Sequence, residues 1–400
     1  MVAYVVNHID RQVMYILMEP VGGELGLSDT ELGWLVGLAF AMFYTVAGIP
    51  IARFADRGNR RNIIAVALVI WSGMTVASGL ARNYLQLLLA RIGVGIGEAG
   101  CTPPAHSLIS DYFPASHRAT ALSVYQLGVP IGTLFGLAAG GFLADELGWR
   151  VAFFVVGAPG VLLGLIVFLT LKEPVRGGFD PDADSEVESL GEVLRFMSGL
   201  PSLRHMLFAT AYQTLALAAV GAWHAIFLSR VHGMSLSAAG LWLGLIAGAS
   251  MVPVFLGGYF GDRLSRSDPR WYMWLPSIGA VLSLPFSVWA YLAGSAELAL
   301  TMIAIATAGN HIYSAIGHAV MQSLVKPRMR AMMSAIALFA MNIVGYGVGP
   351  SLAGMVSDGF GGGENVRYAL IAMVAFMVLA VVHYLLAART FARDLEAKNA

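Results

Sequence analysis

Residues 54–57 read Phe-Ala-Asp-Arg, and residues 260–263 read Phe-Gly-Asp-Arg, 206 positions further along the chain. Each copy ends a long apolar run that a Gly-x-Ser step precedes, at residues 26–28 and 233–235. A third set of matches has a constant offset of 213: Gly132, Gly136, Gly141 and Asp145 with Gly345, Gly349, Gly354 and Asp358. Matches in the same order indicate an internal duplication, so we predict two related halves packed around one cavity.

The composition excludes a soluble protein. Hydrophobic residues make up 58% of the chain and the mean hydropathy is +0.72. Charged residues make up 12%, about half of the roughly 25% that is usual in soluble domains. The net charge is zero, which gives no support for nucleic-acid binding. The single cysteine, Cys101, excludes an internal disulfide and a cysteine-rich metal site, and we expect neither a metal nor a cofactor.

Apolar runs long enough to cross a bilayer occur twelve times. They cover residues 1–18, 30–54, 63–80, 84–109, 119–144, 151–171, 206–229, 236–261, 271–292, 298–325, 331–356 and 368–388. We therefore predict an all-α polytopic membrane protein with twelve transmembrane helices in two pseudo-symmetric six-helix bundles. No secretory signal is visible, and either the numbering begins inside the first helix or the native start lies upstream.

The two predicted bundles are residues 1–171 and 205–400, and an acidic linker over residues 172–204 joins them. Near the end of the linker, apolar residues recur at helical spacing at Leu190, Val193, Leu194 and Met197. This pattern predicts either an amphipathic helix on the membrane surface or a solvated linker.

Basic residues in the loops predict the orientation. With the N-terminus in the cytoplasm, 18 Lys and Arg residues lie in cytoplasmic segments and 4 lie on the opposite side. Because cytoplasmic loops carry an excess of Lys and Arg, both termini are predicted to be cytoplasmic. The short loops suit the inner (plasma) membrane of a bacterium, with an organellar membrane as the alternative.

Two motifs resemble known transporter families. Residues 52–61 resemble the signature loop of the major facilitator superfamily, in which Asp is followed by basic residues, although Ala52 stands where Gly is usual and the second copy has Gly258. Residues 7–11 (Asn-His-Ile-Asp-Arg) and 91–99 are similar to the Spinster family within this superfamily. The Spinster resemblance implies a single-chain amphiphilic lipid as substrate, such as a lysophospholipid or sphingosine phosphate.

Four charged side chains lie deep in predicted helices: Asp10, Arg11, Arg91 and Glu98. Charges inside a membrane are energetically costly, so we expect these four residues to have a function. In a fold of this kind the first and fourth helices are expected to be neighbours, so we predict that Asp10 pairs with Arg91. Glu98 would then exchange its partner and respond to protons, because apolar surroundings favour a neutral carboxyl and a nearby Arg favours a charged one. The alternatives are a static salt bridge, or an Arg that binds an anionic headgroup.

The duplicated Asp-Arg loops predict a latch on the cytoplasmic side. It would consist of Asp56 and Arg57 in the first half and Asp262 and Arg263 in the second half. The alternative is that the acids cap helices and the arginines only enforce the orientation.

Polar and aromatic pairs within the spans are candidates for lining a cavity. These are Tyr125, Gln126, Trp223, His224, Asn310 and His311. A charged first half and an apolar, aromatic second half would suit the head and the tail of an amphiphile.

The predicted function is secondary active transport of an amphiphilic lipid by alternating access, linked to protons. No nucleotide-binding loop, nucleophile elbow or zinc motif is present, so an ATP-driven pump and an enzyme are not supported. The alternatives are a proton-coupled multidrug or organic-anion transporter of the same fold and, in another class, a non-transporting membrane sensor. The lipid substrate and the bilayer are the expected partners, and we expect a monomer.

Overall fold

In a computed structural model of the chain, residues 1–176 and 190–397 are described, and over these ranges the structure contains helices and no strand. Six spans are single helices: α1 (Val2–Leu25), α4 (Arg60–Gly79), α9 (Trp149–Thr170), α11 (Pro201–His232), α14 (Trp271–Leu292) and α19 (Val366–Ala397). Six more are broken: α2 (Asp29–Val36) with α3 (Leu38–Arg57), α5 (Tyr84–Glu98) with α6 (Thr102–Tyr112), α7 (Ala115–Gln126) with α8 (Gly128–Leu147), α12 (Leu236–Ala249) with α13 (Met251–Ser265), α15 (Ala296–Asn310) with α16 (Tyr313–Ser323), and α17 (Arg330–Ala340) with a π-helical stretch (Met341–Val348) and α18 (Gly349–Gly359). The predicted all-α architecture with twelve spans is confirmed.

Nine of these spans are long and apolar enough, within the described residues, to cross a membrane by length and composition. The other three contain α1, α5 with α6, and α15 with α16. The span α1 and the span of α5 with α6 carry the four charged residues that lie deep in predicted helices. The span of α5 with α6 and the span of α15 with α16 are each interrupted by a break in the helix. Broken and charged spans are typical of the sites at which transporters bind their substrates.

The duplicated Gly-x-Ser step turns the chain between consecutive spans. Gly26 and Gly233 both have a positive φ, of 66° and 61°, which glycine adopts without strain at the end of a helix. Ser28 then caps α2 by accepting a hydrogen bond from the Glu31 N–H at 3.2 Å. Ser235 accepts from the Ala238 N–H at 3.3 Å in the same way, ahead of the second copy. The repeat in the sequence is therefore a repeated pair of helix caps.

The described helices form two compact units. One unit contains Met1–Ala183 together with Ala222–Gly248, and the other contains Asp184–Gly221 together with Ala249–Ala400. The bundle boundaries predicted from the sequence differ, because they place residues 222–248 wholly in the second half. Residues 177–189 of the predicted linker lie outside the described residues.

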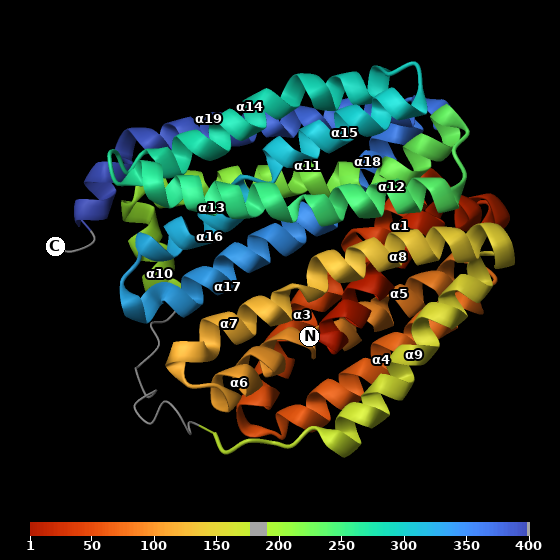
Figure 1. Cartoon of the computed structure of the whole chain (residues 1–400), viewed down its shortest axis with the longest axis horizontal. Coiled ribbons are helices and arrows are strands. Elements are labelled where there is room, and N and C mark those ends of the chain that lie inside the picture. Colours follow the sequence, from red (N-terminus) through yellow and green to blue (C-terminus); the bar gives the residue numbers. More distant parts are fainter. Residues whose placement is uncertain (177–189, 398–400) are drawn as a thin grey trace. The chain divides into compact units, whose positions relative to one another are not determined.

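Glycines bring the helices of the first unit close together. In this unit α1 runs along α8, and α4 runs along α9 (Figure 1). A Cβ added to Gly132 of α8 would lie 2.5 Å from the His8 Cβ, and one added to Gly136 would lie 2.8 Å from the Gln12 Cβ. Because these glycines recur every four residues, they form one face of α8 and allow α1 to pack directly on its backbone.

The second unit is built around α14, which packs against α15 and α19 (Figure 1). Its core also holds one face of helix α10 (Leu190–Gly199), since Val193 and Met197 are buried there. Leu190 and Leu194 are exposed on the same helix. The end of the predicted linker is therefore a helix with one apolar pair packed on the second unit and another pair facing outward.

Candidate functional site

The buried charges of α1 and α5 meet in the first unit. The Arg11 Nε and Nη2 both donate to Glu98 Oε2, at 3.0 Å and 2.6 Å. The Glu98 side chain is fully buried, and the Arg11 side chain is 16% exposed. A buried pair with two charge-assisted hydrogen bonds is strong only while both partners are present, since removing either one leaves an uncompensated charge.

The prediction that Asp10 pairs with Arg91 is wrong for this structure. Asp10 is fully buried, but its Oδ2 accepts a long hydrogen bond of 3.4 Å from the Ser72 hydroxyl on α4. Asp10 and Arg11 are adjacent on α1 and point about 100° apart. The Arg11 side chain points toward Glu98 of α5, so the Asp10 side chain points toward Ser72 of α4.

Several atoms of this cluster are buried without a hydrogen-bond partner in the described part of the chain. They are Asp10 Oδ1, Glu98 Oε1, and Arg91 Nε and Nη1. Buried polar atoms are usually satisfied, and exceptions concentrate at functional sites. The cluster holds two acids and two arginines, so it is neutral overall while all four are charged, but its hydrogen bonding is incomplete.

Helix α5 ends at Glu98, in the middle of the span. Gly100 and Cys101 continue the chain with tighter hydrogen bonds, from Gly100 N–H to the Gly97 carbonyl at 3.0 Å and from Cys101 N–H to the Glu98 carbonyl at 3.0 Å. Helix α6 then begins at Thr102, and two prolines follow in its first turn. The break leaves Glu98 at a helix end inside the membrane-spanning region, a position at which transporters with discontinuous helices bind their substrates.

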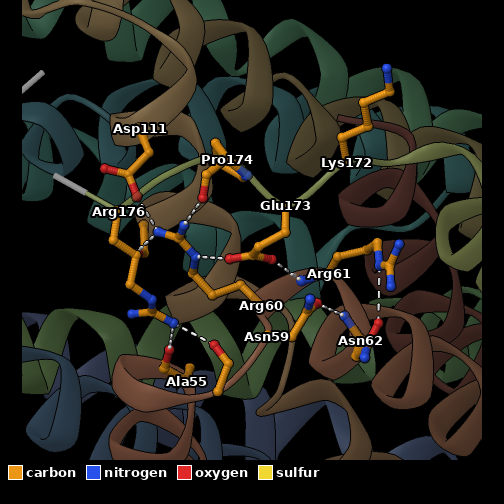
Figure 2. A network of polar contacts seen from close by, with 12 residues as sticks. Ala55, Asn59, Arg60, Arg61, Asn62, Asp111, Lys172, Glu173, Pro174 and Arg176 are labelled. Atoms are coloured by element: carbon orange, nitrogen blue, oxygen red, sulfur yellow. Dashed lines mark hydrogen bonds and ion pairs between the residues drawn. The ribbon is translucent and has the colours of Figure 1, made fainter. Parts of the chain in front are cut away.

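A second polar network surrounds Arg60 at the start of α4. Its guanidinium donates to Glu173 at 2.7 Å, to Asp111, and to the Pro174 carbonyl at 3.3 Å (Figure 2). The Arg60 Nη1 also donates to the Ser107 hydroxyl at 2.8 Å. Arg60 is almost fully buried. One arginine therefore joins α4, α6 and the chain that follows α9.

Further hydrogen bonds of this network hold the loop that carries the first copy of the Asp-Arg motif. The Arg176 side chain donates to the Ala55 carbonyl at 2.6 Å and to the Gly58 carbonyl (Figure 2). The Arg61 N–H donates to the second oxygen of Glu173, at 2.9 Å. These contacts were not predicted, because Glu173 and Arg176 lie more than a hundred positions away from the loop they hold.

The structure describes the side chains of three of the four residues that were predicted to form the latch. Arg57 and Arg263 are exposed, and within residues 1–176 and 190–397 no ion pair is described for either of them. Asp262 accepts a hydrogen bond of 3.0 Å from the Tyr272 hydroxyl. The Asp56 side chain lies outside the described part of the structure. The latch stays a prediction.

A third polar cluster, which we call the Arg230 cluster, was missed at the level of sequence. The Arg230 Nε donates to Glu19 at 2.7 Å, and its Nη1 donates to both oxygens of Asp29 at 2.9 Å and 3.0 Å. Asp29 is buried. A usable signal existed, because Glu19 and Asp29 flank the first predicted loop and Arg230 ends the seventh span, all on the same predicted side of the membrane.

Backbone contacts close the same end of the first unit. A Cβ added to Gly240 of α12 would lie 2.2 Å from the Leu137 carbonyl oxygen, and one added to Gly141 of α8 would lie 2.2 Å from the Leu236 carbonyl oxygen. The Ser237 N–H also donates to Asp145 at 2.7 Å. These contacts explain why residues 222–248 group with the first unit.

The residues of the first unit that were predicted to line a cavity differ in how deeply they are buried. Tyr125 is buried, stacks on Tyr4 with ring centroids 4.4 Å apart, and lies 3.8 Å from the Cys101 sulfur. Gln126 is exposed, Trp223 is fully buried and His224 is partly buried.

In the second unit, the predicted pair Asn310 and His311 marks the break between α15 and α16. The Asn310 carbonyl accepts from the Gln213 side chain at 3.2 Å, and the His311 Nδ1 lies 2.8 Å from the Thr307 carbonyl. The Asn310 side-chain oxygen is buried without a partner in the described chain. A role in lining a cavity stays a prediction for all six residues.

Comparison with known proteins gives consistent matches. A family model for the Major Facilitator Superfamily matches residues 1–345. The chain is 36% identical to an MFS-type efflux pump of Mycolicibacterium smegmatis, over 97% of this chain and 91% of the relative. It is 26% identical to the mouse sphingosine-1-phosphate transporter SPNS2, over 88% of this chain and 68% of the relative. A crystal structure of a bacterial homologue of the human lysosomal transporter Spinster, inward-facing and unoccupied, matches with a TM-score of 0.91 and 34% identity, over 98% of this chain and 96% of that chain.

Proposed function

This chain belongs to the Major Facilitator Superfamily and resembles its Spinster members, and we propose that it moves a phosphorylated single-chain lipid across the membrane by alternating access, linked to protons. It is a multi-pass membrane transporter and not an enzyme. The buried Arg11–Glu98 pair beside Arg91 is the observation that carries the proposal.

In this proposal, Glu98 and the phosphate headgroup of the lipid compete for the guanidinium of Arg11. While Glu98 is charged, it occupies two donors of Arg11. A proton on Glu98 removes that charge and frees Arg11 to bind another anion. A phosphate headgroup matches the fork of a guanidinium, so proton binding and lipid binding at Arg11 would favour each other.

Charge balance supports this exchange. With Asp10 and Glu98 charged, the two acids neutralise Arg11 and Arg91, and protonation of Glu98 leaves one net positive charge. A buried positive charge is costly unless an anion compensates it. A lipid phosphate that binds with one negative charge restores neutrality, and the unpartnered Nε and Nη1 of Arg91 offer further donors.

The names of the relatives support a lipid substrate. The mouse relative is a sphingosine-1-phosphate transporter, and that lipid has one phosphate and one long chain. The Spinster-like crystal structure comes from a homologue of a lysosomal transporter. The substrate that the mouse relative's name gives is compatible with an anionic headgroup at the arginines of α1 and α5.

The Arg230 cluster supports alternating access. It joins the end of α11 to α1 and α2, so these elements must part if that end of the protein opens. With the orientation that the loop charges predict, the cluster lies on the side opposite to the cytoplasm. The protein would then open to that side only when Arg230 separates from Glu19 and Asp29. We place it as a monomer in a bacterial inner membrane, with cytoplasmic termini.

Arg230→Gln should shift the protein toward the state that is open at this end. Gln cannot neutralise buried Asp29, and removing one partner of a buried ion pair costs more than the pair contributes. We expect a roughly tenfold change in the ratio of the two states. Spin labels on cysteines at Gly23 and Met234, in a Cys101→Ala background, report the distance across the cluster. Arg150→Gln, which breaks the more exposed pair with Glu24, is the matched control. Distance distributions equal to those of the control would refute the role of Arg230.

Transport by purified protein in liposomes tests the proposed function. Lysophosphatidic acid, sphingosine phosphate and a neutral monoacylglycerol of the same chain length would be compared, with and without a pH gradient. We expect the two phosphorylated lipids to move and the gradient to accelerate them, while the neutral lipid does not respond. Equal rates for all three lipids would remove the headgroup from the mechanism.

An efflux pump for other amphiphiles is the second candidate, because the Mycolicibacterium smegmatis relative bears that name. Organic cations or dyes that compete with the lipids, or that move when the lipids do not, would favour this function.

A further inference from the structure

One aromatic ring lies against both buried arginines. The Arg11 Cζ is 4.6 Å and the Arg91 Cζ is 5.4 Å from the centre of the Phe40 ring. Tyr44, one turn later on α3, stacks with Phe40 at 5.7 Å and lies 5.1 Å from the Arg11 Cζ. We propose that Phe40 is a positioning residue of the charge cluster, whose ring holds the guanidinium groups of Arg11 and Arg91 beside Glu98.

Local sequence explains why the ring reaches this place. Phe40 lies in the first turn of α3, just after the chain breaks at Gly37. A Cβ added to Gly95 of α5 would lie 2.8 Å from the Phe40 carbonyl oxygen. Gly95 stands four positions after Arg91 and three before Glu98, so it lies on the same face of α5 as both. Its missing side chain lets α3 approach α5 between the two charged residues.

The ring does more than fill space. Arg91 is almost fully buried, and its Nε and Nη1 have no hydrogen-bond partner in the described chain. An aromatic face attracts a cation, and the attraction is largest where water is excluded. Phe40 therefore partly replaces the hydration that Arg91 lacks. An aliphatic side chain of similar size would fill the space but would not attract the two cations.

This role predicts an effect on protons. Glu98 is surrounded by Arg11 and Asp10 from α1, Tyr44 from α3, Arg91 on its own helix, and Cys101 before α6. If the Phe40 ring holds Arg11 against Glu98, a ring that attracts cations less strongly allows Arg11 to separate from Glu98 more easily. Glu98 then takes up its proton at a higher pH. The inference rests on the proposed function for its transport consequence, but not for the protonation of Glu98 itself.

Fluorinated phenylalanines at position 40 test the proposal without changing the shape of the core. Added fluorines withdraw electrons from the ring and weaken its attraction for cations step by step. We expect the pH midpoint of the Glu98 carboxyl band, followed by infrared titration and assigned by its absence in Glu98→Gln, to rise with each fluorine. A trifluorinated ring should move it by about one pH unit, which corresponds to roughly a tenfold change in proton affinity. Phe40→Leu should move it at least as far, and Phe40→Tyr should stay near wild type.

The control is the same fluorinated series at Phe153, an equally buried ring of α9 that packs edge-on against Trp149. A midpoint that is independent of fluorination at position 40, or that moves equally at position 153, would overturn the proposal. A band that does not titrate in the wild type would overturn the proton role of Glu98 and the positioning role with it. If the midpoint moves as expected while transport by the wild type does not depend on pH, the positioning role stands and proton-linked transport fails.

Discussion

Glu98→Gln should abolish most of the pH dependence of transport while the protein still inserts and folds. Gln has nearly the same shape as Glu, and its amide oxygen can still accept from Arg11, but it does not ionise. Where an imposed pH gradient accelerates the wild type about tenfold, we expect less than a twofold effect in the variant, a loss of roughly 1 kcal/mol of coupling. The measurement is the initial rate of lipid transport against pH, for both proteins in the same liposomes.

Asp10→Asn is the matched control for this prediction. Asp10 is as buried as Glu98 and adjacent to Arg11, but it contacts Ser72 in place of an arginine. Because Glu98 can still take up a proton in this variant, we expect its transport rate to keep depending on pH, although the lost charge of Asp10 displaces the midpoint of the curve. If Glu98→Gln retains a curve of the wild-type shape, scaled by a constant factor, Glu98 is not the proton-responsive group and the Arg11–Glu98 pair is a static bridge. If only Asp10→Asn flattens the curve, the proton role belongs to Asp10.

Arg60→Ala should produce the largest loss of stability. The substitution leaves Asp111 and Glu173 without the buried arginine that both contact, and the loss of one partner from a buried ionic network typically costs about 3–5 kcal/mol. Arg60→Lys should recover only part of this loss, because an ammonium group cannot reproduce the planar fork that reaches four acceptors. Thermal unfolding of the purified protein in detergent measures the effect.

Arg61→Ala separates the network from a general effect of removing charge. The Arg61 side chain contacts its neighbour Asn62 at 3.0 Å, and its guanidinium lies over the Phe168 ring. Its contact with Glu173 uses the backbone N–H, which the substitution keeps. We expect a loss of about 1 kcal/mol or less from this variant. Equal losses from Arg60→Ala and Arg61→Ala would show that the network around Arg60 contributes little.

The sequence alone determined the class of fold and the residues that needed a special explanation. A membrane span must be a long apolar run, so twelve runs predicted twelve spans, and the structure contains them. The four deep charges were visible for the same reason, because charge is rare and costly in such runs. The Gly-x-Ser repeats were visible because a helix end and the start of the next helix need particular residues.

Only the tertiary structure decided which of these residues meet. On α1, a rotation of about 100° separates Asp10 from Arg11, so Arg11 reaches Glu98 on α5 while Asp10 contacts Ser72 on α4. Phe40 entered the cluster because Gly95 admits α3, and Arg230 met Glu19 and Asp29 across some 200 positions of sequence. Hydropathy and local spacing describe one helix at a time, whereas a charge pair depends on the rotation and approach of two helices. Those are set by close packing, which no single stretch of the chain contains.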